Sequence, residues 1–419
     1  MRLRNVLSGI LICMAVAGLL AQSTGRRTVP DVLSDNSVKK SLQTLEAMKG
    51  RMANRLAEIA AIPSPSGQEH RRAAKTAEYM RAIGLSDVAV DAAPNAIGRI
   101  PGRSGKALVF ISTLDDLQTV AEHQKAAPRS PWVEGDRVIG PGTNTSSTTV
   151  SMLAAAEALI GSGFKPEHDL VFAAVAQEET GLTGMKRLFQ EYHERALAFV
   201  DILGDGRSIS YGAIGIHWWK VKASGPGGHT LGGGLPNVNQ GIGRSVDRIL
   251  QLPQPDREKA SRTVLNVSII NSGAVFNHKP ETGWFSLDIR SIDASVISEI
   301  EEAVRGILAQ VTRETGIKFE MEPFQLTPGG QIPGAEESPL VKSSVEIARF
   351  LGLDPRLSNA GSSNMNVAVG AGVPAIGLGG DRGGERGTPN EWANVPAMVL
   401  TAKHVFLLAV SLGNCNEPK

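Results

Sequence analysis

A continuous apolar run near the middle of the chain ends in two adjacent glutamates. Residues 170–176 are Leu, Val, Phe and Ala only, a pattern typical of a strand buried on both faces of a parallel sheet. Gln177, Glu178 and Glu179 follow directly. Because open α/β sheets bind ligands beyond the carboxyl ends of their strands, the glutamate pair is a candidate functional site. The alternative is a solvated pair that opens the next helix, where negative charge is favoured.

Similar apolar runs and helical patterns surround this stretch. Amphipathic spacing predicts helices over 38–61 and 68–83, and a glycine-rich turn at 140–145 precedes a third helix over 149–160. Short apolar runs predict two more buried strands, at 107–112 and 197–203. Strands that alternate with helices predict a mostly parallel α/β sheet with right-handed crossovers.

The pattern changes near residue 211 and changes back near residue 323. Within this insert, polar and apolar residues alternate over 218–223, as in an antiparallel strand with one buried face. The further elements predicted for the insert are strands at 263–270 and 283–290 and helices at 238–252 and 296–312. We therefore predict an α/β domain formed by 31–210 and 323–419, and a ferredoxin-like α+β domain formed by 211–322. The α/β domain resumes with a predicted helix at 339–351 and a strand at 373–378.

Composition adds a prediction about location. The chain has 419 residues and a formal net charge of +1, which gives no indication of nucleic acid or an acidic membrane surface as a partner. Residues 1–21 combine two arginines with an apolar stretch too short for a confident membrane span, as in a signal peptide. Its removal takes Cys13 and leaves Cys415, so no internal disulfide is expected. These features predict an exported, periplasmic protein.

The motif around the glutamate pair resembles a known family. Residues 172–186 contain Gln-Glu-Glu-Thr-Gly-Leu and Gly-Met-Lys, as in the dinuclear zinc exopeptidases, the M20-type family of aminoacylase, carboxypeptidase G and peptidase T. Pro-Ser-Pro-Ser-Gly-Gln-Glu at 63–69 and the segment 91–102 also match the family, and the resemblance covers roughly residues 40–415. It implies a catalytic α/β domain, an inserted lid domain that mediates dimerisation, and hydrolysis of amide bonds.

The resemblance also implies roles for the acidic residues. The first glutamate of the pair, Glu178, takes the place of the general base, and Glu179 takes the place of a zinc ligand. The family's His-x-Asp motif reads Thr113-Leu114-Asp115 here, so only the orienting Asp115 is kept, and it is a candidate catalytic residue. The bridging aspartate aligns with Thr145.

Two further ligand positions of the family are also changed. The last histidine aligns with Gly387, just before Thr-Pro-Asn-Glu-Trp. Another acidic ligand aligns with Leu203, flanked by Asp201 and Asp205, of which Asp205 is a candidate metal ligand. Since threonine and glycine do not replace imidazole or a bridging carboxylate, we expect no tightly bound cofactor, and zinc only if the family's chemistry survives.

Residues that hold the substrate in the family are better preserved. His229, in Gly-Gly-His-Thr, corresponds to a catalytic histidine that reaches across the dimer toward the reacting carbonyl. Asn277 corresponds to an asparagine of the lid, and Arg290 to an arginine that grips a substrate carboxylate. Ser362, Ser363 and Asn364 occupy a further substrate-binding motif, written Gly-Ser-Thr-Asp-Ala-Asn in the family.

Three functions remain open from the sequence. The first is an amide or peptide hydrolase for small carboxylate-bearing substrates, with Glu178 as base. The second is a catalytically silent, metal-free protein that binds a peptide-like or acyl-amino-acid ligand, and the third is a purely structural dimer. Without zinc, the glutamates need another cation, and the alternatives are an arginine beside them or arginines that point to solvent. We predict that Arg382 or Arg386 lies within salt-bridge reach of Glu178 or Glu179.

Overall fold

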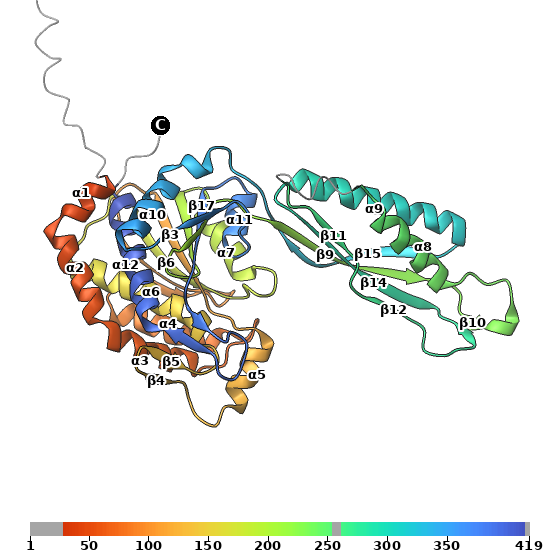
Figure 1. Cartoon of the computed structure of the whole chain (residues 1–419), viewed down its shortest axis with the longest axis horizontal. Coiled ribbons are helices and arrows are strands. Elements are labelled where there is room, and N and C mark those ends of the chain that lie inside the picture. The colour runs from red at the N-terminus through yellow and green to blue at the C-terminus, as the bar shows by residue number, and fades with distance from the viewer. Residues whose placement is uncertain (1–27, 254–260, 415–419) are drawn as a thin grey trace, which may run out of the picture.

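The computed structural model describes residues 28–253 and 261–414. The predicted signal peptide, Cys13 and Cys415 lie outside these ranges. The described chain forms two lobes, a large one that contains both ends and a smaller, elongated one that projects from it (Figure 1).

An eight-stranded sheet forms the centre of the large lobe, in the order β1-β2-β6-β3-β7-β17-β8-β16. Its strands are β1 (Ser86–Val90), β2 (Ala96–Ile100), β3 (Ala107–Thr113), β6 (Asp169–Val175), β7 (Ala196–Ile202), β8 (Ser208–Ser210), β16 (Arg356–Ser358) and β17 (Ala375–Gly379). The four central strands β6, β3, β7 and β17 run parallel, as their apolar runs predict. β1 and β2 form an antiparallel hairpin at one edge, and every residue of β3 and β6 is buried.

Helices cover both faces of this sheet. They are α1 (Val29–Ser34), α2 (Asn36–Ala47), α3 (Lys49–Ala60), α4 (His70–Ala82), α5 (Gln118–Ala126), α6 (Thr143–Gly161), α7 (Thr183–Tyr192), α10 (Pro339–Phe350), α11 (Met365–Gly370) and α12 (Val395–Leu412). α3, α6 and α12 pack in one apolar cluster, and α7 and α11 pack in a second. In the described part of the chain, α12 alone is long and apolar enough to cross a membrane, but 83% of it is buried, as in a core helix.

Short elements complete the large lobe. β4 (Trp132–Glu134), β5 (Arg137–Ile139), β18 (Gly383–Gly384) and β19 (Trp392–Asn394) form a four-stranded sheet, and η2 (Ala335–Glu337) precedes α10. This small sheet joins the segment before α6 to the loop that carries Arg382 and Arg386. Two parts of the sequence far from each other thereby meet beside the carboxyl ends of the central strands.

The smaller lobe has its own antiparallel sheet and core. Its strands are β9 (Gly215–Ser224), β11 (Val264–Asn266), β12 (Ile270–Ser272), β14 (Thr282–Ser291) and β15 (Lys318–Thr327). α8 (Val238–Leu250) and α9 (Ala294–Thr315) cover one face, and a buried apolar cluster that includes Val221, Phe285 and Val304 lies between them and the sheet. β10 (Gly228–His229), η1 (Thr230–Gly232) and β13 (His278–Lys279) form the far tip (Figure 1).

The predicted fold class, an α/β domain with an α+β insert, is confirmed. The exact domain boundaries stay a prediction, although β15 continues to Thr327, beyond the predicted end of the insert at 322. We refer to the smaller lobe as the lid.

Three element predictions need correction. The predicted helix 38–61 is two helices, α2 and α3, that meet at Met48. The predicted strand 263–270 is split into β11 and β12. α6 begins at Thr143, six residues before the predicted start at 149, because Gly142 adopts a left-handed conformation (φ 85°) that turns the chain directly into the helix. Thr145 therefore lies in the first turn of a helix.

Candidate active site

A cavity of about 440 Å³ lies between the two lobes, beyond the carboxyl ends of β3, β6 and β7. Both lobes contribute to its wall. The lining residues are Thr113, Thr145, Glu178, Glu179, Leu182, Leu203, Ile216, Trp218, Arg290, Gln325, Thr327, Ser362, Ser363, Arg382 and Arg386. The position agrees with the general rule for ligand sites in open α/β sheets.

The glutamate pair lies in a turn held by buried carboxylates. The amide of Glu178 donates to Asp115 Oδ1 at 2.8 Å, and the amide of Glu179 donates to Asp115 Oδ2 at 3.1 Å. The amide of Gln177, which has a positive φ of 56°, donates to Glu69 Oε1 at 3.1 Å. Because α7 begins only at Thr183, the pair does not open a helix, and that alternative is wrong.

Asp115 lies behind this turn and does not line the cavity. It is fully buried and also accepts a hydrogen bond of 2.6 Å from Ser66 Oγ. Burial raises the pKa of Asp115 to about 6, although its hydrogen bonds favour the ionised form. Sequence reasoning made Asp115 a candidate catalytic residue, whereas its contacts are those of a residue that positions Glu178 and Glu179. Glu69, its neighbour in this role, was missed, although the segment 63–69 was noted as a motif.

Arg386 supplies a cation to the glutamate pair. Its Nη2 lies 2.7 Å from Glu179 Oε1, so the prediction that Arg382 or Arg386 pairs with a glutamate is confirmed for Arg386. Burial, followed by repulsion from Glu179, Asp201 and Asp115, raises the pKa of Glu178 well above its usual value, and Arg386 opposes this shift.

Arg382 also lines the cavity but has no such partner. Within residues 28–253 and 261–414, its guanidinium forms no hydrogen bond or salt bridge with another side chain. Burial, followed by repulsion from Arg386, lowers the pKa of the guanidinium, and attraction from Glu178 and Glu179 partly offsets this. On the large-lobe side of the cavity, Arg386 is therefore paired with Glu179, whereas Arg382 has no direct partner among the described residues.

Comparison with known proteins gives the family of this architecture. Residues 114–410 match the model of peptidase family M20/M25/M40. The chain belongs to this family.

Individual relatives agree with the assignment. Carboxypeptidase G2 of Pseudomonas sp. strain RS-16 is 27% identical over 201 residues, which span 47% of each protein, so the alignment covers about half of this curated relative. The aminopeptidase PepT of Bacillus cereus superimposes with a TM-score of 0.72 at 19% identity, over 87% of this chain and 98% of PepT. Bacillus subtilis YXEP, a dinuclear metal-binding peptidase of the M20 family, gives a TM-score of 0.66 at 16% identity, over 88% of this chain and 99% of YXEP. Identities this low show the shared fold alone.

The cavity wall of this M20 family member offers few of the side chains that usually hold zinc. Thr113, Thr145 and Leu203 line the cavity at positions that the sequence resemblance equates with metal ligands, and Gly387 donates its amide to Glu391 Oε2 at 3.0 Å. The cavity wall contains two glutamates and no histidine, cysteine or aspartate. In the described ranges, no cluster of three or more such side chains is arranged to hold a metal ion. Zinc needs about four fixed ligands, and Glu179 already pairs with Arg386.

The structure does not bring Asp205, proposed as a metal ligand, into the cavity. Asp205 is buried, and its carboxylate accepts from Arg207 Nε at 2.8 Å and from the amide of Asp381 at 3.3 Å. The carboxylate of Asp201 is also buried and accepts from the amide of Met365 at 3.2 Å. Both aspartates therefore fix neighbouring loops, and the interpretation of Asp205 as a metal ligand needs correction.

The serine motif is divided between the cavity and the interior. Ser362 and Ser363 line the cavity, as expected for residues that contact a ligand. Asn364 is buried, and its Nδ2 donates to Thr113 Oγ1 at 3.2 Å and to Asp201 Oδ1 at 3.4 Å. The structure therefore gives Asn364 a supporting position below Thr113 and not a place in the cavity wall.

Arg290 reaches the cavity from the lid strand β14. Its guanidinium binds Asp288, two residues earlier, with Nε–Oδ1 at 3.0 Å and Nη2–Oδ2 at 3.0 Å. Trp218 Nε1 donates to the same carboxylate at 2.9 Å, and the Trp218 ring lies 5.7 Å from the guanidinium of Arg290. The side chain is thus held in place at the cavity edge.

His229 and Asn277 lie far from the other candidates along the lid. Both are exposed at the β10–β13 tip, where Asn277 Nδ2 lies 3.0 Å from His229 Nε2 (Figure 1). Neither lines the cavity of its own chain. The contact between these two side chains forms within one chain. That His229 reaches across a dimer to a partner's cavity stays a prediction.

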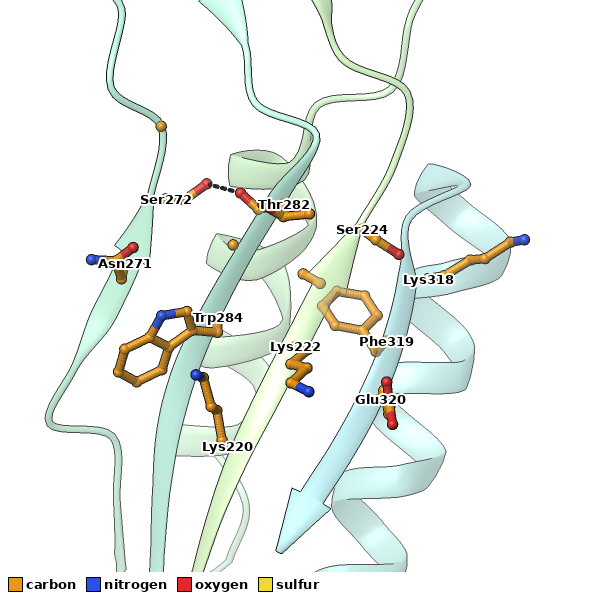
Figure 2. A pocket seen from close by; sticks show the side chains of 13 residues that line it. Lys220, Lys222, Ser224, Asn271, Ser272, Thr282, Trp284, Lys318, Phe319 and Glu320 are labelled. Atoms are coloured by element: carbon orange, nitrogen blue, oxygen red, sulfur yellow. Dashed lines mark hydrogen bonds between the residues drawn. The ribbon is translucent and has the colours of Figure 1, made fainter. Parts of the chain in front are cut away.

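A larger hollow, of about 590 Å³, lies on the lid sheet, where Lys220, Lys222 and Trp284 project from neighbouring strands (Figure 2). The Lys220 ammonium lies 4.8 Å from the Trp284 ring centre, and Lys222 pairs with Glu322. This hollow contains none of the motif residues, so the smaller cavity between the lobes is the candidate active site.

Proposed function

We propose that this M20 family member binds a small peptide-like ligand with a free carboxylate in the cavity between its lobes, without two zinc ions. The observation that carries the proposal is the set of arginines in the cavity wall: Arg290 from the lid, and Arg382 and Arg386 from the large lobe. Guanidinium groups bind carboxylates through paired, charge-assisted hydrogen bonds, and they need no metal to do so.

The size and polarity of the cavity support a ligand of this class. A volume of about 440 Å³ lies in the range of small-molecule sites. Ser362, Ser363, Thr113 and Thr145 add hydroxyl groups that can bind amide or carboxylate oxygens. Trp218 and Leu182 add apolar surface for a side chain of the ligand. Acyl-amino acids and short peptides combine these features.

Amide hydrolysis is the second candidate function, favoured by the family and by the position of Glu178. A general base must lie within reach of the reacting atoms, and Glu178 lines the cavity. Two observations rank hydrolysis second. Glu179 is paired with Arg386, and the cavity wall contains no histidine or aspartate beside the glutamates.

Calorimetric titration with N-acetyl amino acids and dipeptides tests the proposal, and product analysis by chromatography runs in parallel. We expect binding without turnover, unchanged by a chelator, and weakened about tenfold or more in Arg290→Gln, because a charged hydrogen bond contributes roughly 1.5–3 kcal/mol. Turnover that disappears in Glu178→Gln would establish the hydrolase. Absence of binding by every compound of both series would contradict the proposal.

We also propose that the protein is exported. The support is the basic and apolar pattern of residues 1–21 in the sequence. N-terminal sequencing of the protein isolated from its own cells, with fractionation of the periplasm, tests this. An intact N-terminus in the cytoplasmic fraction would contradict it.

A further inference from the structure

Arg382 lacks a direct ion-pair partner among the described residues, although the carboxylates of Glu178 and Glu179 attract it. It lines the cavity, and within residues 28–253 and 261–414 its guanidinium has no hydrogen bond or salt bridge to another side chain. A charge taken partly out of water is costly unless a partner compensates it. Arg382 has lost water without gaining such a partner among the described residues.

The other arginines of the cavity are already paired. Arg386 binds Glu179 at 2.7 Å, and Arg290 binds Asp288 at 3.0 Å. Because Asp288 compensates Arg290 and Glu179 compensates Arg386, Arg382 is the one guanidinium of the cavity wall without a direct carboxylate partner among the described residues. It lies on the side of the large lobe.

We propose that Arg382 binds a second acidic group of the ligand, so that the cavity selects compounds with two carboxylates. One carboxylate binds Arg290 of the lid, and this part of the inference rests on the proposed function. The other meets Arg382 from the loop after β17. N-acylated acidic amino acids and dipeptides that contain one acidic residue belong to this class.

The chemistry of the guanidinium supports a carboxylate at this position. Its planar arrangement of N–H donors matches the two oxygens of a carboxylate, and it cannot give up its charge at neutral pH. A carboxylate bound there would compensate the charge of Arg382 in a site that excludes part of the water. The side-chain carboxylate should therefore improve affinity by about tenfold to a hundredfold.

A matched pair of ligands isolates the second carboxylate. N-acetylglutamate and N-acetylglutamine differ by one carboxylate and have nearly the same shape. We expect wild-type protein to prefer N-acetylglutamate at least tenfold by calorimetry. Arg382→Gln should abolish this preference while it leaves the affinity for N-acetylglutamine within a factor of about three. Arg356→Gln, at an exposed arginine of β16, is the control and should keep the preference.

The outcomes separate this inference from the proposed function. If N-acetylglutamine binds but Arg382→Gln keeps the wild-type preference, or if wild type has none, the inference is overturned and the proposed function stands. If neither compound binds, the proposed function fails, and titration with succinate decides the inference. Succinate binding lost in Arg382→Gln supports it, whereas succinate binding that is absent or unchanged overturns it. Arg382→Lys, which keeps the charge without the paired donors, replaces Arg382→Gln if the latter does not fold.

Discussion

Arg386 Nη2 lies 2.7 Å from Glu179 Oε1, although the two residues are 207 positions apart in sequence. The contact joins the turn after β6 to the segment between β18 and β19. It places a cation of the protein beside the carboxylate that the family resemblance equates with a zinc ligand. The pair is partly buried, since 19% of the Glu179 side chain and 45% of the Arg386 side chain are exposed.

The first prediction concerns this ion pair. Arg386→Gln and Glu179→Gln should each lower the free energy of unfolding, by about 1 kcal/mol or less, because half-exposed ion pairs contribute little. The double variant should lose less than the sum of the single losses, since neither partner is then left unpaired. Urea unfolding at pH 7 measures all three. Strictly additive losses would show that the two side chains do not interact in solution.

The second prediction concerns metal content. The cavity wall offers two glutamates and no histidine, so elemental analysis of purified protein should find less than one zinc ion per chain. A chelator should leave the midpoint of thermal unfolding unchanged. Two tightly bound ions per chain would restore the ordinary dinuclear site and contradict this expectation.

The third prediction concerns Asp115. Asp115→Asn keeps the shape but replaces one acceptor oxygen by a donor that cannot bind an amide N–H. One of the amides of Glu178 and Glu179 should then lose its partner and exchange faster with solvent, by at least tenfold, in native-state hydrogen exchange. Amides of the buried strand β3 away from this turn serve as the reference. Unchanged exchange at both glutamates would remove Asp115 from this positioning role.

The fourth prediction concerns stability in acid. His404 is fully buried in α12, and burial lowers its pKa from 6.5 to about 4. In the unfolded chain the imidazole takes up a proton near pH 6.5, so the folded state loses stability as the pH falls from 6.5 toward 4, by roughly 3 kcal/mol in total. His404→Gln should remove this part of the pH dependence. Urea unfolding at pH 7.5 and 4.5 compares the two proteins, and an equal loss in both would refute the assignment.

The fifth prediction concerns assembly. The resemblance implies a dimer through the lid, and the exposed apolar side chains of Leu231, Val275 and Phe276 at its tip are consistent with a partner there. Light scattering at micromolar concentration should give twice the mass of one chain. Phe276→Ser should shift the balance toward monomer, with Phe350→Ser as a control at an exposed phenylalanine of the large lobe. A wild-type monomer under these conditions would contradict the prediction.

The sequence by itself determined the elements and their grouping. The apolar run at 170–176 predicts β6, because a strand buried on both faces has no polar positions. The alternation at 218–223 predicts β9, because a strand with one buried face has apolar and polar residues in turn. It also predicted that Glu178 and Glu179 follow a buried strand and that an arginine is their counter-charge. These properties depend on local periodicity and on charge balance.

Only the tertiary structure decided which side chains meet. Asp115 and Asp205 looked like candidates for the cavity, yet the backbone amides beside them fix their carboxylates in the interior. Arg382 and Arg386 lie in one short loop and look alike in sequence, but only Arg386 pairs with Glu179. The difference arises because the direction of a side chain depends on contacts with segments hundreds of residues away. Local sequence pattern contains no information about those distances.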